Sequence, residues 1–164
     1  MLQSSSYRDV GMPKIAAMSL SGGMDSTSLL LHLLSEDYSI HALSINYGQK
    51  HVLEIEKARK NIAYLQAEGH AIEHTVLDIS DALGILQSAL TTQEEEVPRG
   101  HYEQDNMKAT VVPNRNAIFI SFLYAFGLSL NKRYGQEVTL SLGVHSGDHA
   151  ISPDCRIEFY DAIL

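Results

Sequence analysis

The sequence predicts an α/β fold with a doubly wound, mostly parallel sheet in a single domain. Three apolar segments suited to buried strands, residues 14–20, 41–46 and 72–78, alternate with two segments of helical character, residues 25–35 and 54–68. This β-α-β-α-β order makes parallel crossovers the default connection. A chain of 164 residues is long enough for one domain with its own core. We expect residues 1–13 to form a flexible leader and residues 14–164 to form the domain.

The loop between the first strand and the first helix has the composition of a phosphate-binding turn. Two adjacent glycines let the backbone approach an anion closely, and the first N–H groups of the following helix have no partner within it. A phosphate is therefore the expected ligand. Asp25 would either cap the helix or hold Mg²⁺ against the phosphates. The residues of this predicted phosphate loop, with serine and threonine hydroxyls as additional donors, are Leu20, Ser21, Gly22, Gly23, Met24, Asp25, Ser26 and Thr27.

The rest of the first half follows the same alternation. Tyr47 to His51 come directly after the second strand, and in an open α/β sheet ligands bind at the carboxyl ends of the strands. We therefore expect this segment beside the phosphate loop. Gly69 is placed to end the second helix. The pattern is lost over residues 79–110, which is typical of either a functional lid or a solvated loop.

The second half contains a third helix and a fourth strand. Residues 117–126 are apolar on most faces, so we expect this helix to be largely buried, with Asn114 or Asn116 as its cap. Arg115 stands at the helix start, where the dipole disfavours a cation, which indicates an anionic partner, either a ligand or a nearby carboxylate. A strand over 137–142, a polar loop over 143–149 on the ligand side and a helix over 157–164 complete the prediction.

Charge and composition exclude several classes of protein. The formal net charge is -8, from 12 basic and 20 acidic side chains, which disfavours a nucleic-acid partner. Cys155 is the single cysteine, so neither an intrachain disulfide nor a cysteine-only zinc site can form. Residues 1–13 lack an apolar signal core and no stretch is suited to span a membrane, which favours a cytoplasmic protein. The loop also lacks the Gly-Lys pair of a kinase or GTPase γ-phosphate site.

Four segments together resemble one enzyme family. Residues 20–27 are similar to the Ser-Gly-Gly-x-Asp-Ser loop of the N-type ATP pyrophosphatases. The other segments are Asn46-Tyr47-Gly48-Gln49 with His51, Val112-Pro113-Asn114-Arg115-Asn116, and Pro153-Asp154-Cys155-Arg156 with Glu158-Phe159. In this order the chain resembles the 7-cyano-7-deazaguanine synthases. The resemblance implies a PP-loop ATPase fold of the adenine nucleotide alpha hydrolase type.

The resemblance also implies an activity. Family members use ATP and Mg²⁺ to convert 7-carboxy-7-deazaguanine and ammonia to 7-cyano-7-deazaguanine, a queuosine precursor, through activation of the carboxylate. Such an enzyme is an ATP-dependent carbon–nitrogen ligase. Two alternatives stay open. One is another PP-loop ATP pyrophosphatase, such as a tRNA-modifying enzyme. The other is a related component of a protein-modifying or phage-defence system.

Residue roles follow from the matched motifs. Asp25, Ser26 and Arg115 are the expected catalytic residues, and Arg115 could pair with the substrate carboxylate in a bidentate fork. Which of the acidic residues recognises the guanine-like N–H groups is open. The expected substrate-binding residues are Tyr47, Gln49, Arg115, Asn116, Asp148, Asp154 and Glu158.

The resemblance is incomplete at two places. Family members carry a four-cysteine zinc region near the C-terminus, which we expect to be absent from this chain, and we expect no other metal site made of protein side chains. Two histidines in the loop at 143–149, and Ser152 where the family usually has Tyr, also depart from the family pattern. The family further implies a small-molecule substrate, no membrane partner and a homodimer.

Overall fold

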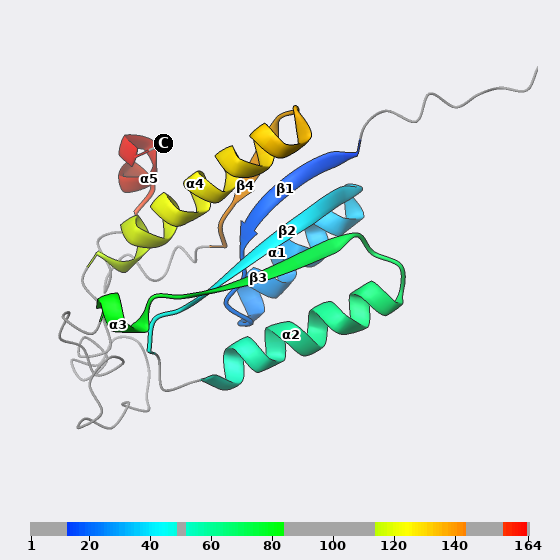
Figure 1. The fold of residues 1–164 in the computed structure, drawn as a ribbon, viewed down its shortest axis with the longest axis horizontal. Coiled ribbons are helices and arrows are strands. Elements are labelled where there is room, and N and C mark those ends of the chain that lie inside the picture. The colour runs from blue at the N-terminus through cyan, green and yellow to red at the C-terminus, as the bar shows by residue number, and fades with distance from the viewer. Residues whose placement is uncertain (1–12, 49–51, 84–113, 144–155, 164) are drawn as a thin grey trace, which may run out of the picture.

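The fold is a single parallel sheet with helices on both faces. The computed structural model describes residues 13–48, 52–83, 114–143 and 156–163. The sheet order is β3-β2-β1-β4, and each neighbouring pair of strands is parallel (Figure 1). The predicted α/β class and parallel sheet are confirmed. The elements are β1 (Lys14–Ser19), α1 (Met24–Ser35), β2 (Tyr38–Asn46), α2 (Val52–Ala67), β3 (Ile72–Asp78), α3 (Ser80–Leu83), α4 (Arg115–Tyr134), β4 (Val138–Ser141) and α5 (Ile157–Ile163).

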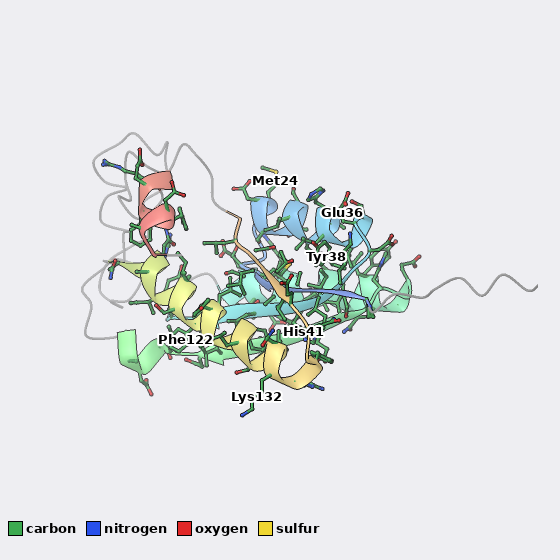
Figure 2. All side chains as sticks on the ribbon, turned by 90° about the horizontal axis from the view of Figure 1, so that it is seen from above. Met24, Glu36, Tyr38, His41, Phe122 and Lys132 are labelled. Carbon is green, nitrogen blue, oxygen red and sulfur yellow. The ribbon has the colours of Figure 1, made fainter. Side chains whose placement is uncertain are left out.

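Alternate residues of the central strands build two separate cores. Side chains of consecutive strand residues point to opposite faces of a sheet, so each strand contributes to both. Helices α1 and α2 cover one face and α4 covers the other (Figures 1 and 2). The first core contains Ala16, Met18, Leu20, Leu30, Leu33, Ile40, Ala42, Ala58, Ile62, Leu65 and Ile72. The second contains Ala17, Leu43, Ile45, Leu123 and Leu130.

Several element ends differ from the prediction. β2 begins at Tyr38 rather than residue 41, because Lys14 of β1 pairs in register with Tyr38. α3 is a short helix in a region where no pattern was recognised. α4 is longer than predicted and ends at Gly135, which has a φ of 68° and donates its N–H to the Asn131 carbonyl at 2.8 Å. Gly69 ends α2 as predicted: its φ is 93°, and the His70 N–H reaches the Leu65 carbonyl at 3.1 Å.

The prediction that the third long helix is largely buried was wrong. On α4, Ile120, Leu123, Gly127 and Leu130 are buried. The opposite side of the helix is exposed, because within the described ranges the sheet packs against only one side of it. Figure 2 shows Phe122 on this outer side. The large apolar residues exposed there are Phe122 at 37%, Tyr124 at 52% and Leu128 at 54%.

The two regions of least certain sequence pattern lie outside the described residues. These are the predicted leader at 1–13, except for its last residue, and most of the segment at 79–110, so whether the latter is a lid or a solvated loop stays open. Within the part of the chain that the structure describes, no helix is long and apolar enough to cross a membrane.

Candidate functional site

The loop after β1 lies at the switch point of the sheet. The chain leaves β1 through α1 to reach β2 on one side, whereas β4 pairs with β1 on the other side. Connections on the two sides of β1 therefore diverge at its carboxyl end, which is where open α/β sheets bind ligands. The sequence-predicted phosphate loop occupies this position.

Leu20 begins the loop and is bonded at both of its backbone polar groups. Its N–H donates to the Leu43 carbonyl at 2.9 Å, and its carbonyl accepts the hydroxyl of Ser44 at 2.6 Å. Leu20 itself is 1% exposed. The loop therefore starts from a fixed point on β2 rather than from a free strand end.

Gly22 makes the closest backbone contact of the loop. Its φ is 86°, a left-handed conformation that glycine adopts without a Cβ penalty. A Cβ at this position would overlap the carbonyl oxygen of Glu54 and lie 3.2 Å from the backbone nitrogen of Ala58. Gly22 thus lets the loop rest directly against the first turns of α2.

Gly23 is the N-cap of α1, and no side chain in the described part of the chain caps this helix. The hydroxyls of Ser26 and Thr27 both donate to the Gly23 carbonyl, at 3.2 and 2.8 Å. The Ser21 hydroxyl accepts the Gly23 N–H at 3.2 Å and lies 3.0 Å from the Ser26 hydroxyl. These hydroxyls shape the loop internally, so the available donors for an anion are the backbone N–H groups of the first turn.

Asp25 does not cap the helix, although capping was one of its two predicted roles. It is exposed in the first turn of α1, next to the uncapped N–H groups. A carboxylate at this position suits the second predicted role, a cation bound between itself and phosphate oxygens. Hard divalent cations prefer oxygen ligands, and the remainder of the shell would come from the phosphates and water.

Gly143 brings the end of β4 against the same helix start. A Cβ on Gly143 would lie 3.4 Å from the carbonyl carbon of Asp25 and 3.4 Å from the backbone nitrogen of Ser26. The sequence placed the loop at 143–149 on the ligand side but gave no reason to single out this glycine. Its position directly after a strand was the only available signal.

Tyr47 and Arg115 meet at the same edge of the sheet, as predicted for the segment that follows β2. The Arg115 guanidinium lies 5.9 Å from the centroid of the Tyr47 ring, which in turn is 5.3 Å from the Phe119 ring. Among the described residues no carboxylate forms an ion pair with Arg115. The choice between a ligand anion and a nearby carboxylate therefore stays open.

A polar network missed by the sequence supports the Tyr47 turn. Asn46 accepts the Gly48 N–H at 3.2 Å and donates to the Asp78 carboxylate at 2.9 Å. The Ser80 hydroxyl and N–H both donate to the other Asp78 oxygen, at 2.6 and 3.0 Å. These bonds, led by the Ser80 hydroxyl, lower the pKa of Asp78 from its ordinary value. An aspartate at a strand end with a serine two residues later was the available signal.

The remaining predicted residues are less informative. Asn116 follows Arg115 in the first turn of α4. Asn114 is the N-cap residue of this helix, but its side chain makes no capping hydrogen bond. Glu158 is exposed on α5, which lies beside the first turns of α4 (Figures 1 and 2). Gln49, Asp148 and Asp154 lie outside the described residues. Within the described ranges, no group of three His, Cys, Asp or Glu side chains could hold a metal.

The fold and the loop first define the class of the protein: an α/β protein with a Gly-rich loop at the switch point of a parallel sheet. Residues 15–164 match the family model described as "Queuosine biosynthesis protein QueC". The chain belongs to this family.

Relatives named 7-cyano-7-deazaguanine synthase match over most of the chain. The protein of Caldicellulosiruptor bescii is 44% identical over 148 residues, 90% of this chain and 62% of the relative. That of Hahella chejuensis is 42% identical over 150 residues, 92% of this chain and 61% of the relative. That of Marinobacter nauticus is 46% identical over 141 residues, 86% of this chain and 59% of the relative. The chain thus spans about three fifths of the length of these relatives.

Proposed function

We propose that the chain carries the ATP-binding part of an enzyme that converts 7-carboxy-7-deazaguanine and ammonia to 7-cyano-7-deazaguanine. The observation that carries the proposal is that an uncapped helix start and Arg115 both belong to the carboxyl edge of one sheet. Carboxylate activation needs a phosphate site and a carboxylate site on the same side of the protein. The names of the relatives supply the product, 7-cyano-7-deazaguanine, and the family resemblance implies the corresponding 7-carboxy compound as the substrate.

The loop residues suit the phosphates of ATP. The backbone N–H groups at the start of α1 would bind phosphate oxygens, and Asp25 would hold Mg²⁺ against them. When bound, ATP supplies the adenylyl group that activates the carboxylate. The residues of the loop neutralise and orient charge, and nothing in it acts as a covalent nucleophile. Gly22 keeps the loop close to α2, because a side chain at this position would displace backbone.

Arg115 and Tyr47 suit the deazaguanine carboxylate. A guanidinium can bind both carboxylate oxygens in a fork and can stack on an aromatic ring at the same time. The contact with Tyr47 at 5.9 Å holds the guanidinium near the start of α4, where it would orient the carboxylate for attack by ammonia. Ammonia would displace AMP from the adenylated carboxyl to give the amide, and adenylation of the amide oxygen by a second ATP, followed by loss of AMP and a proton, would give the nitrile.

The test is a product assay with two candidate substrates offered separately and a control that contains neither. The protein is incubated with ATP, Mg²⁺ and ammonia together with 7-carboxy-7-deazaguanine, with bulk tRNA, or with neither, and AMP and the nitrile are quantified. We expect AMP release and nitrile formation with the small carboxylate alone. AMP release stimulated by tRNA and not by the carboxylate would overturn the proposal in favour of a tRNA-modifying enzyme. Light scattering on the same sample tests the implied homodimer.

A further inference from the structure

We infer that Ser44 and His74 are positioning residues that fix the phosphate loop through a chain of hydrogen bonds across three strands. His74 on β3 bonds to Ser44 on β2 at 2.8 Å, and Ser44 bonds to the carbonyl of Leu20 at 2.6 Å. Leu20 is the residue from which the loop departs. The inference rests on the proposed function only in assigning phosphate binding to that loop.

The direction of each bond follows from the donors available. A carbonyl oxygen only accepts, so the single hydroxyl proton of Ser44 must point at Leu20. The Ser44 oxygen therefore accepts from His74, whose Nε2 must carry a proton. Burial lowers the pKa of His74, and nearby Arg59 lowers it further. Both the neutral Nε2–H tautomer and the protonated ring keep this donor, so the chain of bonds survives either state.

Burial makes this chain of bonds hard to replace. Ser44 is 1% exposed and lies on the sheet face that carries the apolar core under α1 and α2. Water cannot take over a lost hydroxyl at such a site without entering the core. Without Ser44, the Leu20 carbonyl would be left as an unpaired acceptor, and the cheapest relief is a shift of the loop toward solvent.

These hydrogen bonds hold Leu20, the residue at which a displacement would move the whole loop. Because the Leu20 N–H also donates to the Leu43 carbonyl at 2.9 Å, both backbone polar groups of Leu20 are fixed to β2. Ser21 and Gly22 follow immediately, and Gly22 has no spare room against Glu54. A small rotation at Leu20 would therefore move the loop as a unit and misdirect the N–H groups at the start of α1.

The experiment compares Ser44→Ala with two control variants. Ser129→Ala removes a hydroxyl that also donates to a backbone carbonyl, at 3.0 Å, but far from the loop on α4. Ile72→Val weakens the same core face on β3 without touching the bonds. Amide hydrogen exchange of residues 20–27 and affinity for a non-hydrolysable ATP analogue are measured on all four proteins.

We expect Ser44→Ala to raise exchange in the loop and to weaken analogue binding by about tenfold, the loss of one buried hydrogen bond. Both controls should leave the two readouts within about twofold of the wild type. Loop exchange equal in Ser44→Ala and Ile72→Val would overturn the inference. Wild-type protein that binds no analogue would contradict the proposed function instead, and the exchange data would still decide the role of Ser44.

His74 provides the second test, which also covers a Ser44 variant that fails to fold. His74→Gln keeps a donor near the position of Nε2, whereas His74→Leu removes it. We expect His74→Gln to retain loop protection and analogue affinity, and His74→Leu to lose severalfold of each. Equal loop exchange in the two variants would show that His74 merely fills space.

Discussion

Replacing Gly22 by alanine tests the central claim about the loop, that it rests against α2 with no room for a side chain. The φ of 86° costs a non-glycine residue about 1–2 kcal/mol. The overlap of its Cβ with the backbone carbonyl of Glu54 adds about 1–3 kcal/mol, because backbone on two elements must move. Reduced freedom of the unfolded chain returns about 0.4–1 kcal/mol. The net loss of unfolding free energy is therefore about 3 kcal/mol.

Two other glycines separate the terms of this estimate. Gly69 also has a positive φ, 93°, but a Cβ there meets nothing within 4 Å, so Gly69→Ala reports the strain alone, about 1 kcal/mol after the unfolded-state gain. Gly23 has a φ of −75°, and its Cβ would approach only the flexible Ser21 hydroxyl at 3.3 Å. We expect Gly23→Ala to change stability by less than about 1 kcal/mol.

The assay is urea denaturation followed by circular dichroism. The three variants are compared on the condition that their unfolding free energies depend equally steeply on urea concentration. The expected order of destabilisation is Gly22→Ala, then Gly69→Ala, then Gly23→Ala. If Gly22→Ala proved no less stable than Gly69→Ala, the contact with Glu54 would carry no energy and the packing argument would be refuted.

Three further predictions concern charge. Burial lowers the pKa of His41 and His74 in the folded state below 6.5, so the unfolded state binds more protons. The stability should therefore be full above about pH 7 and should fall as the pH drops below 6.5. Denaturation midpoints measured at pH 5 and 7.5 should differ less for His41→Gln than for the wild type. Asp25→Ala should abolish AMP release with an unchanged denaturation midpoint, since Asp25 is exposed; wild-type turnover would refute the loop assignment. Arg115→Lys should raise the KM for the carboxylate about tenfold without changing ATP-analogue affinity, because lysine lacks the fork; an equal effect on both ligands would contradict the division of the site.

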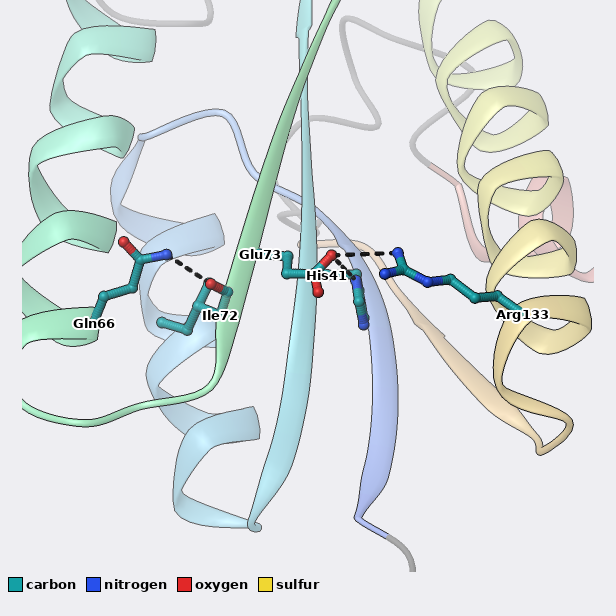
Figure 3. A network of polar contacts seen from close by, with 5 residues as sticks. All are labelled: His41, Gln66, Ile72, Glu73 and Arg133. Carbon is teal, nitrogen blue, oxygen red and sulfur yellow. Dashed lines mark hydrogen bonds and ion pairs between the residues drawn. The ribbon is translucent and has the colours of Figure 1, made fainter.

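His41, on the other sheet face, contributes to this pH dependence from a cluster outside the phosphate loop. His41 is 3% exposed, and its Nδ1 lies 3.3 Å from Glu73, which is also 3.7 Å from Arg133 (Figure 3). Burial dominates and lowers the pKa of His41, while the Glu73 carboxylate partly offsets it. The cluster joins β2, which carries His41, to β3, which carries Glu73, and to α4, which carries Arg133. The ring of Tyr134 on α4 also packs against His41, with 5.4 Å between the ring centroids. None of these residues belongs to the loop.

Local pattern was enough to predict the sheet and the loop. Apolar runs, a Gly-rich turn and helical spacing can each be recognised from residues that are close together in the sequence. The rule that parallel sheets bind ligands at the carboxyl ends of their strands then led us to expect Tyr47 beside the loop. The contact of Tyr47 with Arg115 was not predicted, because it joins the end of β2 to the start of α4, which lie far apart in the sequence.

Features that depend on contacts between residues distant in the sequence could not be predicted from local sequence patterns. A stretch that is apolar on most faces does not show which side a sheet will cover, so Phe122 and Tyr124 were expected inside although they are exposed. The serine at position 44 looks like any small strand residue until its hydroxyl is seen on the Leu20 carbonyl. The glycine at 143 likewise gains meaning only from the backbone of Asp25 and Ser26 beside it.

These distant contacts explain why the loop can present its donors before a ligand arrives. The loop is fixed from three directions: Leu20 is bonded to β2, Gly22 rests on α2, and Gly143 brings the end of β4 against the start of α1. The N–H groups of the first turn are thus oriented by folding itself, and binding an anion requires little further ordering. A site arranged in this way should lose ligand affinity when any of the three supports is altered, even though Ser44 and Gly143 offer no side-chain group to the ligand. Under the proposed function, these supports, rather than the Ser-Gly-Gly motif alone, prepare the loop to bind phosphate.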